Sequence, residues 1–111
     1  MTQPSALPAT INLTAYRGDT WAQPFRFLNG GAPVDFTDKT VACEARDHGG
    51  NVLTLDVAGD ADGYVTLRLP AGSVPPNTYT YDIEVTDVDG NVATWVRGSL
   101  YVQRDVTHEL P

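Results

Sequence analysis

The side chains that could carry acid–base or nucleophilic chemistry are sparse in this sequence. There are two histidines, His48 and His108, and neither has a serine, cysteine or carboxylate at a spacing that suggests a catalytic triad. His48 lies in a glycine-rich stretch, and His108 lies near the end of the chain. We therefore predict that both histidines are exposed and that the protein is not an enzyme.

Closely spaced aspartates raise a second possibility, a bound calcium ion. The stretch Asp87-Val88-Asp89-Gly90-Asn91 resembles a fragment of an EF-hand loop, but such a loop needs further ligands, a bidentate glutamate and flanking helices. Asp-Gly pairs are also favoured in hairpin turns. We interpret this stretch and residues 60–63 as turns and predict no metal and no cofactor, with a loosely bound ion between the acidic turns left open.

Cys43 is the single cysteine, so an intrachain disulfide or a thiolate metal cluster cannot form. It alternates with Val41 and Ala45 in an apolar pattern of period two. A small apolar side chain in that position is typical of a core residue. We predict a buried, unreactive thiol.

The charge of the chain argues against two classes of partner. Seven basic and 14 acidic residues give a formal net charge of −7, and the acidic residues are dispersed. Such a surface repels phosphate backbones and anionic lipid, so we expect no nucleic acid and no membrane as a partner. The sequence shows no secretory signal and no apolar run of the ~18 residues typical of a membrane span. We expect a soluble protein made in a cytoplasm.

Period-two alternation of apolar and polar residues runs through most of the 111 residues and predicts β-strands. Turn sequences rich in glycine, asparagine and aspartate separate about seven such segments. The expected fold is all-β, a single antiparallel immunoglobulin-like β-sandwich. We place the domain at residues 10–106, after an extended arm at residues 1–9 and before a tail at residues 107–111.

The first two strands are expected to form a hairpin. Residues 11–16 alternate, Arg17-Gly18-Asp19-Thr20 has the composition of a tight turn, and a second alternating run begins at Trp21. Pro24 in that run cannot donate a ladder hydrogen bond and predicts an edge strand or a bulge.

The last strand, expected at residues 92–103, is apolar on both faces. Alternation places Trp95, Arg97 and Tyr101 on the face opposite Val96 and its apolar neighbours. Because tryptophan, tyrosine and arginine are enriched at interface centres, we predict a protein interface there, the alternative being that this face is the core face. Tyr64 and Arg68 share the outward face of their own strand and are further interface candidates, the alternative being a plain solvated surface.

The order of these turn and strand sequences resembles the β-sandwich domains of tailed-phage proteins, namely the start of baseplate-upper proteins and the small minor tail proteins of actinobacterial phages. The resemblance covers residues 10–107. Its landmarks are residues 11–21, Gly31-Ala32-Pro33-Val34-Asp35-Phe36-Thr37, Gly63-Tyr64-Val65-Thr66-Leu67, Asn77-Thr78-Tyr79-Thr80-Tyr81-Asp82-Ile83, and Gly98-Ser99-Leu100-Tyr101-Val102 with Asp105-Val106-Thr107.

The resemblance implies a virion structural protein of a phage tail, neck or baseplate. Its expected partners are other phage structural proteins, with several copies of this chain in one particle. The chain ends after the sandwich, whereas longer members continue into receptor-binding or fibre parts, which favours a structural subunit over a receptor-binding one. The alternative is a capsid decoration or host-carbohydrate adhesion module.

Overall fold

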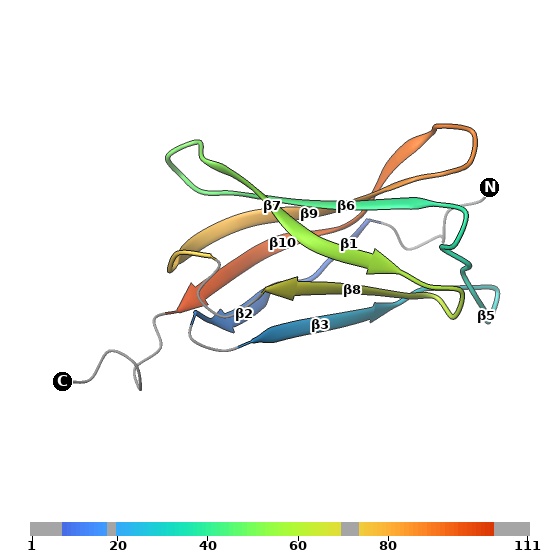
Figure 1. Ribbon diagram of the computed structural model, residues 1–111, viewed down its shortest axis with the longest axis horizontal. Coiled ribbons are helices and arrows are strands. Elements are labelled where there is room, and N and C mark those ends of the chain that lie inside the picture. The colour runs from blue at the N-terminus through green and yellow to red at the C-terminus, as the bar shows by residue number, and fades with distance from the viewer. Residues whose placement is uncertain (1–7, 18–19, 70–73, 104–111) are drawn as a thin grey trace.

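The computed structural model describes residues 8–17, 20–69 and 74–103. All regular structure in these residues is β-strand, which confirms the predicted all-β class (Figure 1). The strands are β1 (Ala9–Thr10), β2 (Leu13–Tyr16), β3 (Trp21–Arg26), β4 (Leu28–Asn29), β5 (Ala32–Pro33), β6 (Thr40–Arg46), β7 (Val52–Gly59), β8 (Tyr64–Leu69), β9 (Asn77–Thr86) and β10 (Val92–Gln103).

Eight of these strands form one sheet in the order β1–β10–β9–β6–β7–β8–β3, with β2 also paired to β10; β4 and β5 form a separate hairpin. The sheet curls into two layers because β7 changes partner along its length. Its first half pairs with β6, where Leu55 lies opposite Cys43, and its second half pairs with β8, where Asp56 lies opposite Arg68. Figure 1 shows β7 crossing between the layers.

The core lies between the two layers and is filled by alternate residues, as the period-two pattern predicts. Val65, Leu67 and Leu69 of β8 face it, and so does the apolar row of β9. That row consists of Tyr79, Tyr81, Ile83 and Val85. The predicted inward faces of these two strands are confirmed.

Strand β3 ends the sheet and pairs only with β8 among the described residues. Pro24 sits in the middle of it, opposite Thr66. Because proline lacks the backbone N–H, it is tolerated where one side of the strand has no partner. The edge strand predicted from Pro24 is confirmed.

The predicted first hairpin is wrong. Strand β2 pairs in parallel with β10, whereas β3 pairs with β8 in the other layer. Strands β2 and β3 therefore do not pair with each other, and Gly18 and Asp19 of the predicted turn lie outside the described residues. Local turn composition cannot reveal this, because the pairing partners lie far away in the sequence. The β1 and β2 pairings also make the sheet mixed, not purely antiparallel.

A small group of contacts holds the N-terminal strands on β10. Ala9 pairs with Val96, and Leu13 pairs with Leu100. Strands β1 and β2 therefore keep the same register on β10, although the pairing is interrupted between them. At the interruption the hydroxyl of Tyr81 donates a hydrogen bond to the Ile11 carbonyl at 2.7 Å. The Asn12 side chain accepts one from the Ser99 N–H at 3.1 Å, which replaces a ladder bond.

Candidate interaction surfaces

Trp95 is a core residue, which corrects its assignment to an outer interface. Its side chain is 1% exposed and packs edge-on against Phe27 and Phe36, with ring centroids 5.3 and 5.4 Å away. The β9–β10 register shifts between Thr94 and Val96, so Trp95 is the extra residue of a β-bulge. A bulge puts consecutive residues on one side, and Trp95 and Val96 both face inward.

The same bulge reverses the predicted faces before it. Val92 is 59% exposed, although alternation places it with the buried Val96. Ala93 packs against the core in its place. Beyond the bulge the prediction is correct, since Leu100 and Val102 are buried.

Arg97 and Tyr101 lie on the outer face of β10, as the alternation predicts, and both are exposed. The structure adds Tyr16 to them. In the parallel β2–β10 pair, Thr14 lies opposite Tyr101 and Tyr16 opposite Gln103, so the two tyrosines are diagonal neighbours on one face. Tyr16 is 48% exposed and Tyr101 47%. Tyr16 could not be assigned to this surface from the sequence, because only the long-range pairing of β2 with β10 brings it to Tyr101.

Tyr64 and Arg68 are exposed on the opposite layer, on β8. The guanidinium of Arg26 lies 5.1 Å from the Tyr64 ring centroid, a cation–π distance, and its Nε donates a hydrogen bond to the Asp62 carbonyl. Arg26 lies directly opposite Tyr64 in the β3–β8 pair. The candidate interface residues thus divide between two opposite faces and the core.

The aspartate turns use their carboxylates to hold their own backbones. In residues 87–91, the Asp87 carboxylate accepts hydrogen bonds from the backbone N–H groups of Asp89 and Asn91 at 2.9 and 3.0 Å. Gly90 follows with φ +85°, as such a turn requires. Residues 47–51 repeat this pattern with Asp47, and residues 60–64 repeat its backbone bonds with Asp60. These contacts support the interpretation of the stretches as turns.

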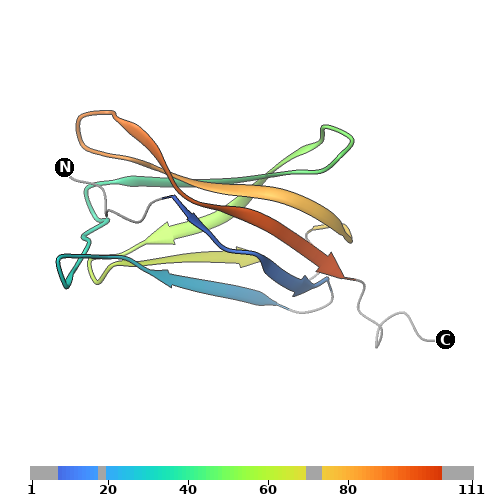
Figure 2. The same ribbon diagram turned by 180° about the vertical axis from the view of Figure 1, so that it is seen from behind.

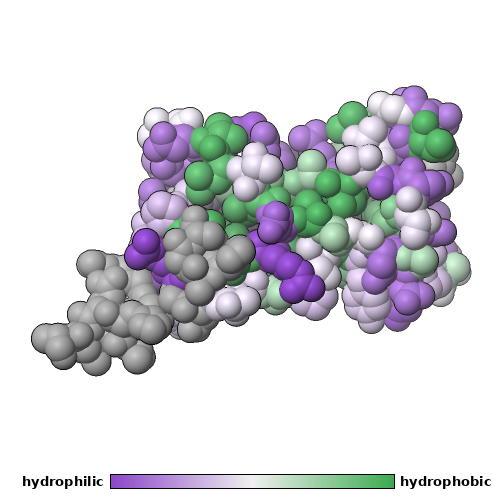
Figure 3. Space-filling model, viewed as in Figure 1, coloured by the Kyte–Doolittle hydropathy of each residue, from purple (hydrophilic) through white to green (hydrophobic). Residues whose placement is uncertain are grey.

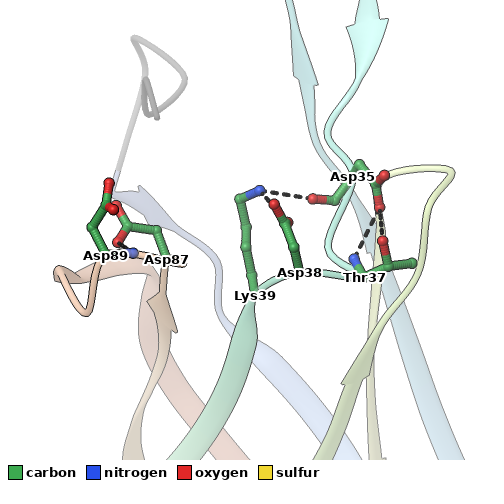
Figure 4. A network of polar contacts seen from close by, with 6 residues as sticks. All are labelled: Asp35, Thr37, Asp38, Lys39, Asp87 and Asp89. Atoms are coloured by element: carbon green, nitrogen blue, oxygen red, sulfur yellow. Dashed lines mark hydrogen bonds and ion pairs between the residues drawn. The ribbon is translucent and has the colours of Figure 1, made fainter.

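The acidic residues of the loop that precedes β6 also make local hydrogen bonds and an ion pair. The Asp35 carboxylate accepts hydrogen bonds from the Thr37 hydroxyl and N–H, and Lys39 forms an ion pair with Asp38 at 2.9 Å (Figure 4). Within the described part of the chain, no group of three or more histidine, cysteine or acidic side chains is placed to hold a metal ion.

The hydrogen bonds within the turns also lower the pKa values of Asp47 and Asp87. The side chain and N–H of Asn51 lower the pKa of Asp47, and the N–H and side chain of Asn91 lower the pKa of Asp87. Each bond favours the charged carboxylate, so each turn is better held when its aspartate is ionised.

Cys43 is buried at 1% exposure, as predicted. Burial, with smaller contributions from Asp82 and Glu44, raises the pKa of its thiol to about 12. A thiol of that acidity is almost entirely protonated at neutral pH and is a poor nucleophile. His48 is exposed in its turn, and His108 lies outside the described residues.

Two hollows adjoin the first half of β7. One has a volume of ≈ 240 Å³ and is bordered by Leu55, Val74 and the Asp56–Arg68 pair; the other, ≈ 440 Å³, is bordered by Leu53, Tyr79 and the 47–51 turn. Figure 3 shows this side of the molecule, with hydrophobic residues in a broken band between two protruding hairpins. Neither lining set contains a histidine or a cysteine.

Among the residues that the structure describes, no helix has the length and apolarity needed to cross a membrane. No protein-family model matches the sequence, and no curated protein sequence matches it.

Solved structures resemble the fold. A family 123 glycoside hydrolase from Clostridium perfringens superposes with a TM-score of 0.57 at 15% identity over 88% of this chain. The match spans only 23% of the hydrolase chain. The titin M3 domain superposes with a TM-score of 0.52 at 18% identity, over 84% of this chain and 88% of the titin chain. At these identities the likeness shows the fold alone.

Proposed function

We propose that this chain is a non-enzymatic structural subunit of a tailed bacteriophage particle. It is an immunoglobulin-like β-sandwich of the tail, neck or baseplate that acts through protein–protein contacts with copies of itself and with other phage structural proteins. Its place of action is the virion, and neither nucleic acid nor membrane is a partner.

The immunoglobulin-like assignment is supported by the size match to the titin M3 domain, of which the chain covers 88%. A second support is the Tyr79 hydroxyl, which donates a hydrogen bond to the Pro75 carbonyl at 2.7 Å near the start of β9. A tyrosine that bonds back to the backbone a few residues upstream is the tyrosine corner found in such sandwiches.

The observation that carries the assembly role is the pair of exposed aromatic–arginine surfaces on opposite layers. One contains Tyr16, Tyr101 and Arg97, and the other contains Tyr64 and Arg68. Side chains of these types on rigid strands contribute much of the binding free energy at protein interfaces. Two such surfaces on opposite sides let one subunit contact two neighbours. The phage context rests on the sequence resemblance.

Particles purified from the phage or prophage whose genome encodes this chain test the proposal. Quantitative mass spectrometry should find the chain at several copies per particle, and a nonsense mutation in its gene should give DNA-filled heads with absent or defective tails. Absence of the chain from purified particles overturns the proposal. Its recovery with isolated heads only, from a gene beside the major-capsid gene, supports the decoration alternative instead.

A further inference from the structure

One edge of the sheet has no partner strand in the part of the chain that the structure describes. Among the described residues, β1 and β2 pair with β10 and with nothing else. The N–H of Ile11 donates to the Arg97 carbonyl, and that of Arg17 to the Gln103 carbonyl, each at 2.9 Å. Because backbone groups alternate in direction along a strand, the N–H and C=O of Thr14 and Tyr16 point away from β10, toward the open side. Figure 2 shows these strands, in blue, along the red β10.

The two edges of the sheet are built differently. The β3 edge carries Pro24 at its centre, a residue that blocks pairing with another strand. Residues 9–16 contain neither a proline nor a charged residue. Proline and charged residues are two of the devices that protect natural sheet edges; β2 is short but has neither, so it is a candidate for strand pairing with another chain.

Large side chains flank the open edge. Tyr16 and Tyr101 are diagonal neighbours on the outer face, each close to half exposed. When a strand docks on a sheet edge, main-chain hydrogen bonds hold it, and side chains on the adjoining face select it. The two tyrosines are placed for that selection.

The edge is also a carboxylate-free region of an acidic protein. Residues 9–17 and 96–103 contain no aspartate or glutamate, but they contain Arg17 and Arg97, in a chain of formal net charge −7. The first carboxylate on the neighbouring strand is Asp82, which lies opposite Arg97. Two copies can therefore meet along this edge without bringing their acidic loops together.

We propose that this edge is the contact between two copies of the chain, with β2 of one copy paired antiparallel to β2 of the other about a twofold axis. Antiparallel pairing of identical strands is self-complementary, since each outward N–H meets a C=O of the partner. The sheet then continues across both copies, with Tyr16 and Tyr101 of each beside the seam. This inference rests on the proposed structural role and specifies its self-contact.

Sedimentation equilibrium of the full chain over about 1–200 µM tests the proposal, because weak self-contacts fall in that range. The wild-type chain should shift from monomer to dimer and stop there. Thr14→Pro removes an outward N–H and no internal hydrogen bond, so it should leave a folded monomer. Tyr101→Ser should raise the dimer dissociation constant at least about tenfold. Tyr64→Ser, on the opposite layer, is the matched control and should dimerise as the wild type does.

Circular dichroism and thermal melting verify that each variant is folded, and Tyr101→Ser serves as the test should Thr14→Pro unfold. A wild-type chain that stays monomeric overturns the self-contact. The self-contact is also overturned if Tyr64→Ser weakens dimerisation while Tyr101→Ser does not. Association that continues beyond the dimer overturns it as well. Because particle composition is measured separately, a monomeric chain that is still found in purified particles refutes the edge contact and leaves the structural role standing.

Discussion

Gly98 of β10 leaves no room for a side chain, because the backbone of Ile11, between β1 and β2, lies against it. A Cβ at this position would lie 2.0 Å from the Ile11 carbonyl oxygen and 2.7 Å from its carbon, both of them backbone atoms. Backbone cannot move aside as a flexible side chain can. Gly98→Ala should therefore lower the free energy of unfolding by about 1–3 kcal/mol, measured by urea denaturation.

Gly49 provides the matched control for that substitution. Its added Cβ would meet only side-chain atoms, at 3.4 and 3.7 Å, which is ordinary contact. Gly49→Ala should leave the urea midpoint nearly unchanged. If the two substitutions lower the free energy of unfolding equally, the contact with the Ile11 backbone is not the reason that position 98 requires glycine.

Trp95 shows why residue type alone does not locate an interface. Its burial against Phe27 and Phe36 means that Trp95→Ala creates a cavity in the core. We expect a loss of about 3–5 kcal/mol in the free energy of unfolding of the isolated chain, measured by thermal or chemical denaturation. A stable Trp95→Ala monomer with a defect only in assembly would restore the interface assignment.

Asp47 and Asp87 should make the stability of two hairpins depend on pH. Both pKa values lie below the ordinary 3.8 in the folded state. The stabilisation is therefore present above pH 3.8 and is lost as pH falls through the lower, folded-state pKa. The urea midpoint should decrease as the pH is lowered below about 4. The decrease should be less steep in the Asp47→Asn/Asp87→Asn double variant. Parallel curves for the two proteins would contradict this.

Among the structural elements, the N-terminal segment that contains β1 and β2 is fixed to the sheet by a hydrogen bond from one buried hydroxyl. Tyr81, 1% exposed, donates to the Ile11 carbonyl across 70 residues of sequence. Tyr81→Phe leaves that carbonyl without its partner and should cost about 1–2 kcal/mol. Hydrogen exchange should become faster in residues 9–16 first. Tyr79→Phe removes a different hydroxyl bond, to Pro75, and should leave exchange in those residues unchanged.

The sequence predicts elements best where strands alternate regularly and turns are local. The inward faces of β8 and β9, the edge position of Pro24 and the glycine turns all follow from period and turn composition. The bulge at Trp95 does not, because one extra residue reverses the face of every residue before it. The parallel pairing of β2 with β10 does not either, since it joins residues more than 80 positions apart.

At the scale of the whole molecule, a single core lies between two layers whose outer faces differ. The β10 side presents the open edge with Tyr16 and Tyr101, and the β8 side presents Tyr64 and Arg68. Arg97, Tyr101, Tyr64 and Arg68 were predictable as outward residues from alternation alone. That they form two separate surfaces, and that Tyr16 belongs to one of them, required knowledge of which strands pair.

The proposed structural role can be tested by a cryo-EM map of particles from the phage or prophage whose genome encodes this chain. We expect density for several symmetry-related copies of this sandwich in the tail, neck or baseplate. The β2 edge should contact another copy of the chain, and the Tyr64–Arg68 face should contact a neighbouring structural protein. A complete particle map in which no density fits the sandwich would overturn the proposed structural role.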